Sequence, residues 1–320
     1  MKIGFLACPG TLTGSPVRRA DAFEHDQQVA ALRGAMEPAG MELVEMDWRR
    51  PVQDFAGMQL VLLGTVWDYQ DSKDAFLGQL DRLEQAGIIL CNSAGIVRWN
   101  IDKSYLRELA DAGAPTIPTL WPDAPCSSDV EAAFAHFACD TVVVKRRVGA
   151  GAEGQFIFSR GDAALAGWTM DRPAMIQPFL PAITTEGEYS FIVIDGELSH
   201  CVLKTAAAGD YRIQSVYGGR EEVFCPDAAD RAAASAIIAA LPFPTPLYAR
   251  VDMVRGANGA LALMEAEMIE PYLYPLQGPH MGEQVVKAIT RQLGSMAPED
   301  RPLKPAPGSQ PLKPDDVEHI

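Results

Sequence analysis

The most constraining feature of the sequence is an acidic hairpin near the C-terminal end. Two strands are predicted, over Leu247–Arg255 and Ala260–Glu270, with Gly256–Gly259 as the turn between them. Gly and Asn tolerate the positive φ that a tight turn needs. Because alternate side chains of a strand share a face, Glu265 and Glu267 are expected to point the same way.

Asp252 on the first strand joins these two acids if the turn holds an even number of residues. In that register Asp252 lies opposite Leu263 and diagonal to Glu265, with diagonal neighbours about 7–8 Å apart. Converging carboxylates repel one another unless a cation lies between them. Mg2+ carrying nucleotide phosphates satisfies such a set, since Mg2+ prefers a few carboxylates together with phosphate oxygens. A solvated hairpin face is the alternative, but apolar neighbours such as Met253 and Met268 favour burial, and buried acids need partners.

Composition limits the classes of function. The chain has 320 residues, of which 48% are apolar and 22% charged, as in a globular protein with two or three subdomains. A net charge of −15 argues against binding to nucleic acid or to an anionic membrane. Six cysteines without CxxC spacing fit a reducing compartment. Without a signal peptide or a long apolar run, we expect a cytoplasmic protein with no membrane span, and a homodimer as the default assembly.

Strand and helix signals alternate over residues 1–95. Strands are expected at Lys2–Cys8, Met41–Trp48, Leu60–Val66 and Ile88–Cys91, and helices at Asp21–Ala39 and Lys73–Ala86. This alternation predicts a parallel sheet covered by helices. Trp67–Tyr69 follows a strand at the carboxyl edge of that sheet, where α/β proteins bind ligands, although a packed turn explains the pattern equally well.

A glycine loop separates two further predicted strands between residues 141 and 159. Gly149, Gly151 and Gly154 satisfy G-x-G-x-x-G, but Gln155–Phe158 has the composition of a strand instead of the helix that dinucleotide binding requires. A dinucleotide oxidoreductase is therefore disfavoured. Backbone N–H groups of such a loop can cover phosphates, with Lys145 at its base supplying charge. An ordinary hairpin loop is the alternative, and the basic residues beside it weigh against that interpretation.

Lys103 and the missing hydrolase motifs bear on the kind of chemistry, although neither identifies it alone. Lys103 lies in the first turn of a helix expected over Asp102–Ala112, where it faces either an anion or, as is common for lysine, solvent. The sequence contains no G-x-S-x-G or H-E-x-x-H, and its five histidines form no spaced pair. This pattern fits phosphoryl transfer better than hydrolysis.

The order of these parts resembles the ATP-grasp superfamily, and most of all its glutathione-synthetase branch. The resemblance runs from about Asn92 to Pro271 and includes the stretch QPFLPAITTEGE, Gln177 to Glu188. It implies an α/β fold, with an α+β ATP-grasp part. A parallel-sheet pre-ATP-grasp domain at 1–95 would be followed by two ATP-grasp subdomains that clasp ATP, at 96–175 and 176–296. Residues 297–320 are expected to be a disordered Pro-rich tail. The stretch YARVDM…MEAEMIEPYLYP is also similar to the D-cycloserine-forming cyclo-ligases.

The resemblance also implies a role for each site residue. ATP is expected to contact Lys103, Lys145, Gly149, Gly151, Gly154, Gln177, Phe179, Leu180 and Glu188. Mg2+, or alternatively Mn2+, is expected on Asp252, Glu265 and Glu267. Lys204 and Arg212 are expected to stabilise the transferring phosphoryl group.

The implied function is an ADP-forming carboxylate–amine ligase. Phosphorylation turns an unreactive carboxylate into an acyl phosphate, so the protein must align the groups and neutralise charge. A small amino-acid-like substrate is expected near Trp67, Asp68, Ser190 and Arg212. Ser190 stands where glutathione synthetases carry a substrate-binding Arg, so a γ-glutamylcysteine-like substrate is in doubt. Glu267 stands where Asn is usual, which adds a negative charge that would strengthen cation binding or recruit a basic neighbour such as Arg250. An intramolecular cyclo-ligase and a non-catalytic ATP-binding module are the alternatives.

Overall fold

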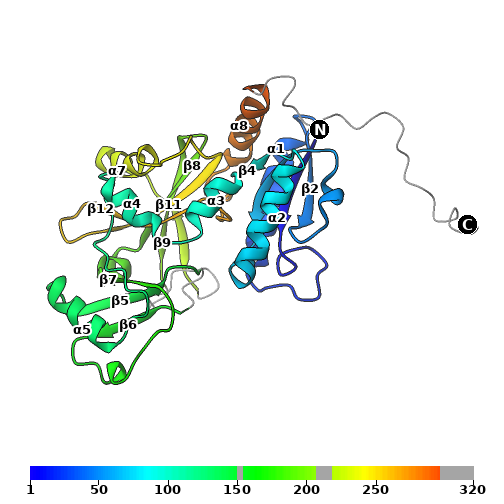
Figure 1. The fold of residues 1–320 in the computed structure, drawn as a ribbon. Helices are drawn as coiled ribbons and strands as arrows, with labels where there is room; N and C mark the ends of the chain where they lie inside the picture. The colour runs from blue at the N-terminus through cyan, green and yellow to red at the C-terminus, as the bar shows by residue number, and fades with distance from the viewer. Residues whose placement is uncertain (150–153, 207–217, 296–320) are drawn as a thin grey trace, which may run out of the picture.

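The computed structural model describes residues 1–149, 154–206 and 218–295. The described residues form a parallel N-terminal sheet, a central antiparallel sheet and a small third sheet, together with the helices that cover them (Figure 1). The predicted α/β class, with a parallel sheet followed by antiparallel ones, is confirmed. None of the described helices has the length and apolar character needed to cross a bilayer. The tail predicted at 297–320 lies outside the described residues.

The N-terminal sheet has the strand order β2-β1-β3-β4, with every pair parallel. Its strands are β1 (Lys2–Ala7), β2 (Glu42–Asp47), β3 (Met58–Thr65) and β4 (Leu90–Cys91). Successive residues of β3 pack on opposite faces, Leu62 with helix α1 (Ala22–Met36) and Leu63 with helix α2 (Lys73–Gln85). A strand buried on both faces consists of a continuous run of apolar residues, and this run is why β3 could be predicted from the sequence.

Helix α8 (Met281–Ser295) returns to the N-terminal domain and packs beside α1 (Figure 1). Gly282 permits the close approach, because a Cβ at this position would lie 2.6 Å from the carbonyl oxygen of Ala31. Val285 and Ile289 of α8 share one hydrophobic core with Ile3 of β1. That core is therefore built from both ends of the described chain.

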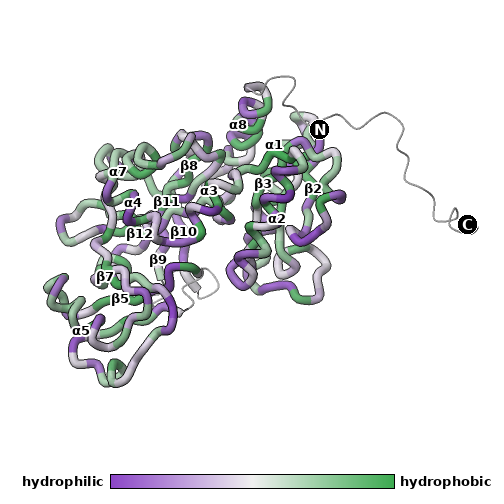
Figure 2. Tube along the Cα trace, in the orientation of Figure 1, coloured by the Kyte–Doolittle hydropathy of each residue, from purple (hydrophilic) through white to green (hydrophobic). Residues whose placement is uncertain are grey.

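The central sheet has the order β10-β9-β8-β11-β12 and is antiparallel throughout. Its strands are β8 (Glu188–Ile194), β9 (Glu197–Thr205), β10 (Arg220–Val223), β11 (Tyr248–Arg255) and β12 (Leu261–Glu267). Val251 and Met253 lie in one core with side chains of helices α4 (Tyr105–Asp111) and α7 (Ala228–Ala239). Figure 2 contrasts the hydrophobic β3 with the hydrophilic edge strand β10.

The third sheet has the order β6-β5-β7 and packs against helix α5 (Ser127–His136). Its strands are β5 (Thr141–Arg146), β6 (Phe156–Ser159) and β7 (Ala174–Pro178). Because β6 follows the glycine loop, the prediction of a strand at this point is confirmed. The remaining short helices are α3 (Ala94–Asn100), α6 (Ala182–Thr185), η1 (Val52–Phe55), η2 (Tyr69–Ser72) and η3 (Ala163–Leu165).

Asn92 ties the end of the N-terminal sheet to the central sheet. Its Nδ2 donates to the carbonyl oxygens of Tyr248 at 2.9 Å and Met268 at 2.8 Å, and its Oδ1 accepts from the Leu247 amide at 2.8 Å. The side chain is buried, so water cannot replace these bonds.

We expect Asn92→Ala to lower the free energy of unfolding by about 3 kcal/mol, because three buried backbone groups lose a partner worth about 1 kcal/mol each. Chemical denaturation monitored by circular dichroism measures this loss. Gln85→Ala, at an exposed helix position, is the control and should change the value by less than about 0.5 kcal/mol. A loss of that small size for Asn92→Ala would contradict the prediction.

A buried histidine links α1 to two strands of the N-terminal sheet. His25 lies 2.7 Å from Thr65 Oγ1 and 2.8 Å from Glu45 Oε2, and Arg33 donates to the other Glu45 oxygen at 2.5 Å. The His25 hydrogen bond, aided by Arg33 and opposed by partial burial, lowers the pKa of Glu45 from 4.5 to about 2.

A carboxyl whose pKa is lower in the folded protein stabilises the fold above its ordinary pKa. That stabilisation is lost as the pH falls through the folded value. Glu45→Gln should therefore cost about 2 kcal/mol at pH 7, with the difference from wild type vanishing between pH 4.5 and 2. Denaturation across pH measures it, with exposed Glu42→Gln on the same strand as control. A difference that stays constant from pH 7 to 2 would refute this account.

Candidate active site

A β-bulge in the hairpin places the predicted acids on one face. Next to the turn Arg255 pairs with Leu261, and Met253 pairs with Leu263. The register then shifts by one residue, so that Asp252 pairs with Glu265. The expected register, with Asp252 opposite Leu263, is therefore wrong. In an unbroken ladder Asp252 would pair with Met264 and Glu265 would face the opposite core, so the bulge is what brings the two acids together.

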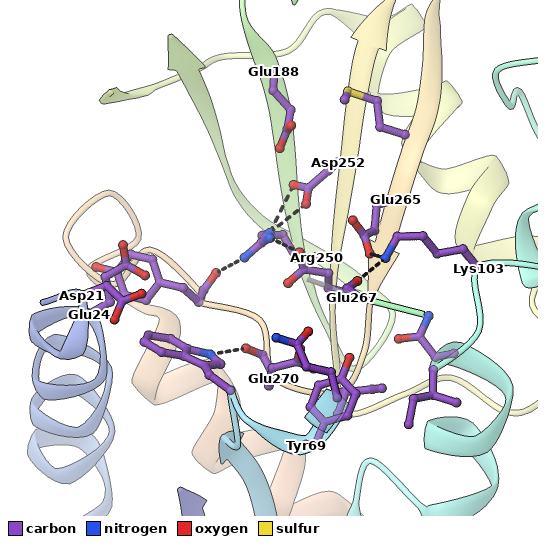
Figure 3. A pocket seen from close by; sticks show the side chains of 18 of the residues that line it. Asp21, Glu24, Tyr69, Lys103, Glu188, Arg250, Asp252, Glu265, Glu267 and Glu270 are labelled. Atoms are coloured by element: carbon purple, nitrogen blue, oxygen red, sulfur yellow. Dashed lines mark hydrogen bonds and ion pairs between the residues drawn. The ribbon is translucent and has the colours of Figure 1, made fainter. Parts of the chain in front are cut away.

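Arg250 is the cation at the centre of this face. Its Nε lies 3.0 Å from Asp252 Oδ2, Nη2 donates to Glu267, and Nη1 donates to the carbonyl oxygen of Tyr272 at 3.2 Å (Figure 3). Burial opposes the charge of Arg250, but Asp252 and Glu267 outweigh it and raise the pKa of the guanidinium well above its ordinary value. Two carboxylates are thus held by one internal arginine.

Lys204 pairs with Glu188, another acid that lines this part of the protein. Its Nζ contacts the Glu188 carboxylate and lies 3.4 Å from Asp252 Oδ1. Burial would raise the pKa of Asp252, but Arg250 and Lys204 outweigh it and the net shift is downward. The ring of Tyr274 lies 5.7 Å from both Lys204 Nζ and Arg250 Cζ, so an aromatic face supports both cations.

Two lysines meet beside the glycine loop. Lys103 Nζ lies 2.8 Å from Glu265 Oε1 and donates to the carbonyl oxygen of Gly149 at 2.6 Å. Lys145 is half-buried nearby without an ion pair to any described residue, and this burial lowers its pKa. Gly154 has φ +68°, and a Cβ there would lie 2.4 Å from Arg146 Nε. An anion placed between the two lysines would offset the cost of burying them.

Lys103 precedes its helix instead of lying within the first turn. Helix α4 begins at Tyr105, because the Asp102 carboxylate accepts from the Ser104 amide at 2.9 Å and pairs with Arg147. The predicted helix start at Asp102 is therefore wrong. The irregular backbone turns Lys103 into the protein, and the solvent-facing alternative is excluded by its contacts with Glu265 and Gly149.

These groups line a cleft of about 510 Å3 between the N-terminal domain and the central sheet, a size typical of small-molecule sites. Of the predicted residues, the cleft lining includes Lys103, Lys145, Gly149, Glu188, Lys204, Asp252, Glu265 and Glu267. Of the residues not predicted as site residues, it includes Arg19, Asp21, Glu24, Tyr69, Gln70, Arg250, Glu270 and Tyr274. Figure 3 shows Asp21 and Glu24 at the side of the cleft near α1 and Tyr69 beside Glu270.

Other predicted residues lie elsewhere. Gln177 is buried and donates to Thr119 Oγ1 at 3.0 Å; Phe179 and Leu180 follow it at the end of β7, away from the cleft lining. Gly151 and Arg212 lie outside the described residues. Trp67 lines the cleft as expected, but Asp68 turns away and accepts from Trp48 Nε1 at 2.8 Å. The adenine and phosphoryl roles assigned to these positions stay predictions.

The three predicted metal ligands share the face but do not enclose a cavity for an ion. Within residues 1–149, 154–206 and 218–295, no three His, Cys, Asp or Glu side chains are arranged to hold a metal. Arg250 lies between Asp252 and Glu267, and Lys103 pairs with Glu265. Burial raises the pKa of Glu267 to about 7 in spite of Arg250. Any ion at this site must therefore bring ligands of its own.

Some cleft residues were missed because no local pattern marks them. Arg250 was expected only as a basic neighbour of Glu267, with which it pairs; its contact with Asp252 also follows from the sequence, since Arg250 is two residues before Asp252 and so shares its strand face. Glu270 was assigned to the end of a strand, but β12 stops at Glu267. Tyr69 lies across the cleft from a segment about 200 positions away, and only the docking of two sheets brings it close to Glu270.

A parallel domain, a central antiparallel sheet and a small sheet with a glycine loop together make up the fold of the ATP-grasp ligases. The chain has this fold, and its homology is to enzymes of this class. Residues 3–92 match the family described as "D-cycloserine synthetase DcsG, N-terminal domain".

Two curated relatives and several solved structures show the similarity. The cycloserine biosynthesis protein DcsG of Streptomyces lavendulae is 28% identical over 267 residues, 78% of this chain and 88% of that protein. The glutathione synthetase of Prochlorococcus marinus (strain MIT 9313) is 27% identical over 222 residues, 67% of this chain and 69% of that protein.

The structural matches agree in fold. The crystal structure of D-cycloserine synthetase DcsG superposes with a TM-score of 0.77 at 23% identity, covering 91% of this chain and 99% of that one. D-alanine–D-alanine ligase of Bacillus anthracis gives 0.62 at 19% identity, covering 91% and 96%. The ATP-grasp ligase PsnB, solved with a minimal precursor, Mg and ADP, gives 0.61 at 15% identity, covering 91% and 97%.

Replacing Arg250 by Met should leave Asp252 and Glu267 buried without their cation and lower the free energy of unfolding by about 3–5 kcal/mol. Thermal and chemical denaturation measure the loss. Arg107→Met, at an exposed position of α4, is the matched control. A change within about 1 kcal/mol of wild type would show that the guanidinium does not hold the charged face together.

Proposed function

We propose that the protein is an ATP-dependent carboxylate–amine ligase that activates a small, amino-acid-like carboxylate as an acyl phosphate. The observation that carries the proposal is the cleft, in which two lysines beside a glycine loop face the carboxylates of a hairpin. A nucleotide triphosphate needs cations for its phosphates and acids for its metal, and this cleft supplies both. Two of the structural relatives named above, D-alanine–D-alanine ligase and PsnB, are ligases by name.

Lys103 and Lys145 are the residues we assign to the α- and β-phosphates. Lys145 is half-buried and forms no ion pair with a carboxylate among the described residues, so an anion would satisfy it. Lys103 also touches the carbonyl oxygen of Gly149, which couples the lysine to the start of the glycine loop. Gly149, Gly151 and Gly154 would cover the phosphates with backbone N–H groups. Phe179, Leu180 and the backbone near Gln177 are assigned to adenine.

We assign Mg2+ mainly to Glu265 and Glu267. Their side chains are 34% and 26% exposed, whereas that of Asp252 is 5% exposed and held by Arg250, Lys204 and Ser190. One or two carboxylates plus phosphate oxygens are what Mg2+ takes in nucleotide enzymes, so the donor set fits; Mn2+ would fit as well. The ion would neutralise charge on the phosphates. Asp252 would keep Arg250 and Lys204 in place.

Arg250 and Lys204 would stabilise the negative charge that develops as the phosphoryl group moves to the carboxylate. Arg212, outside the described residues, is expected to join them. We divide the chain into an N-terminal domain at 1–95, ATP-grasp subdomains at 96–175 and 176–296, and a tail at 297–320. Aromatic residues of the first segment would close the substrate end of the cleft.

Intramolecular cyclisation is the second candidate reaction. The similarity to DcsG extends over 267 residues, against 222 for glutathione synthetase, and the matched family is the DcsG N-terminal domain. A cyclo-ligase uses the same activation, with the nucleophile in the same molecule. Mass spectrometry of the product distinguishes the two, because cyclisation removes one water from a single substrate and requires no second amine.

Release of ADP from ATP and Mg2+ with a panel of amino acids and dipeptides tests the function. Glu265→Gln and Lys145→Ala should each lower kcat/KM by about 100-fold or more, since each removes a charge that faces the phosphates. Lys145→Ala should also weaken binding of a non-hydrolysable ATP analogue by calorimetry. Glu283→Gln and Lys287→Ala, both exposed on α8, are the controls. Unchanged turnover in both site variants would reject the assignment.

A further inference from the structure

Glu270 is a buried carboxyl that the ATP chemistry above does not use. It lies three residues beyond the end of β12 and is 8% exposed. The neighbouring acids Asp252 and Glu267 bind Arg250, while Glu265 binds Lys103. Glu270 has no ion pair with a basic side chain in the described part of the chain; its carboxyl bonds to the phenol of Tyr69.

The residues around Glu270 come from the N-terminal domain and include a hydrogen-bond donor and an acceptor that has no donor of its own. Trp67 Nε1 donates to the Glu270 carbonyl oxygen at 3.1 Å, which joins the loop after β3 to the segment after β12. Gln70, beside Tyr69, lines the same cleft with a buried Oε1 that accepts no hydrogen bond. A buried acceptor without a donor is unusual in a native structure and calls for a partner.

We propose that Glu270, Tyr69 and Gln70 form a subsite for a protonated amino group of the substrate. An ammonium group offers three donors and one positive charge, which matches a carboxylate, an amide oxygen and a phenol. It would also supply Glu270 with an ion-pair partner, which no basic side chain among the described residues does. This inference rests on the proposed ligase function, and it names a primary amine as the group recognised at this end of the cleft.

The position of the subsite suits an amine that must reach an activated carboxylate. Glu270 follows Glu267 by three residues, and the fields of Glu265 and Glu267 both act on it. The subsite therefore adjoins the acids assigned to the nucleotide's metal. Trp67 and Tyr69 line the same cleft as Lys103 and Lys145, so the amine end and the phosphate end of a small substrate fit within it.

The test compares amines with analogues that lack the amino group. Calorimetry on the full chain with Mg2+ and a non-hydrolysable ATP analogue gives Kd for the common L- and D-amino acids and their 2-hydroxy acid counterparts. At least one amino acid should bind about tenfold or more tightly than its counterpart, or about 1.4 kcal/mol. If no amino acid is preferred, the inference is overturned. Failure of the protein to bind the Mg2+–nucleotide at all would instead show that the proposed function is wrong.

Single substitutions test which residues are responsible for the preference for amino acids over 2-hydroxy acids. Glu270→Gln keeps the size of the side chain and should abolish the amino-acid preference, while leaving nucleotide Kd within twofold. Tyr69→Phe should weaken the preference and carries the test if Glu270→Gln fails to fold. Glu283→Gln, exposed on α8, should behave as wild type. If the amino-acid preference survives in both site variants, Glu270 does not recognise the amine. The same conclusion follows if the variants lose Mg2+–nucleotide binding as much as they lose amino-acid binding.

Discussion

The functional face of this protein depends on buried charges of alternating sign. Arg250 holds Asp252 and Glu267, Lys204 holds Glu188, and Lys103 holds Glu265. Each carboxylate would be costly to bury alone, and each cation would be as well. The set is stable only as a whole, which explains how so many ionisable groups share one small cleft.

The same sheet face changes character along its length. At one end Ile194 and Tyr248 lie in the core that includes α1 and α8, and at the other end Arg250 and Asp252 line the cleft. The apolar end docks the N-terminal domain, so the charged end lies at the carboxyl edge of the parallel sheet. The packing of the apolar end thus determines which aromatic side chains of the N-terminal domain lie beside the charged residues of the central sheet.

The sequence predicted those features that depend on local periodicity. The parallel N-terminal sheet, the strand after the glycine loop and the shared face of Glu265 and Glu267 all follow from patterns of two or about four residues. The register between β11 and β12 could not be predicted, because nothing in the amino-acid composition marks the extra residue of the bulge at Met264.

Long-range contacts were equally hidden. The burial of Lys103 depends on the Asp102–Arg147 pair, which keeps its backbone out of the helix. Trp67 and Glu270 are 203 positions apart, and their hydrogen bond exists only because two sheets dock. Such juxtapositions follow from packing of whole domains, which single-sequence patterns do not encode.

The return of α8 to the first domain has a consequence for biosynthesis. Ile3 and Phe5 of β1 are translated nearly three hundred codons before Val285 and Ile289, which complete their core. The apolar face that α8 covers must remain open throughout synthesis. Cellular chaperones that shield exposed apolar strands would therefore have their longest period of engagement at the beginning of this chain.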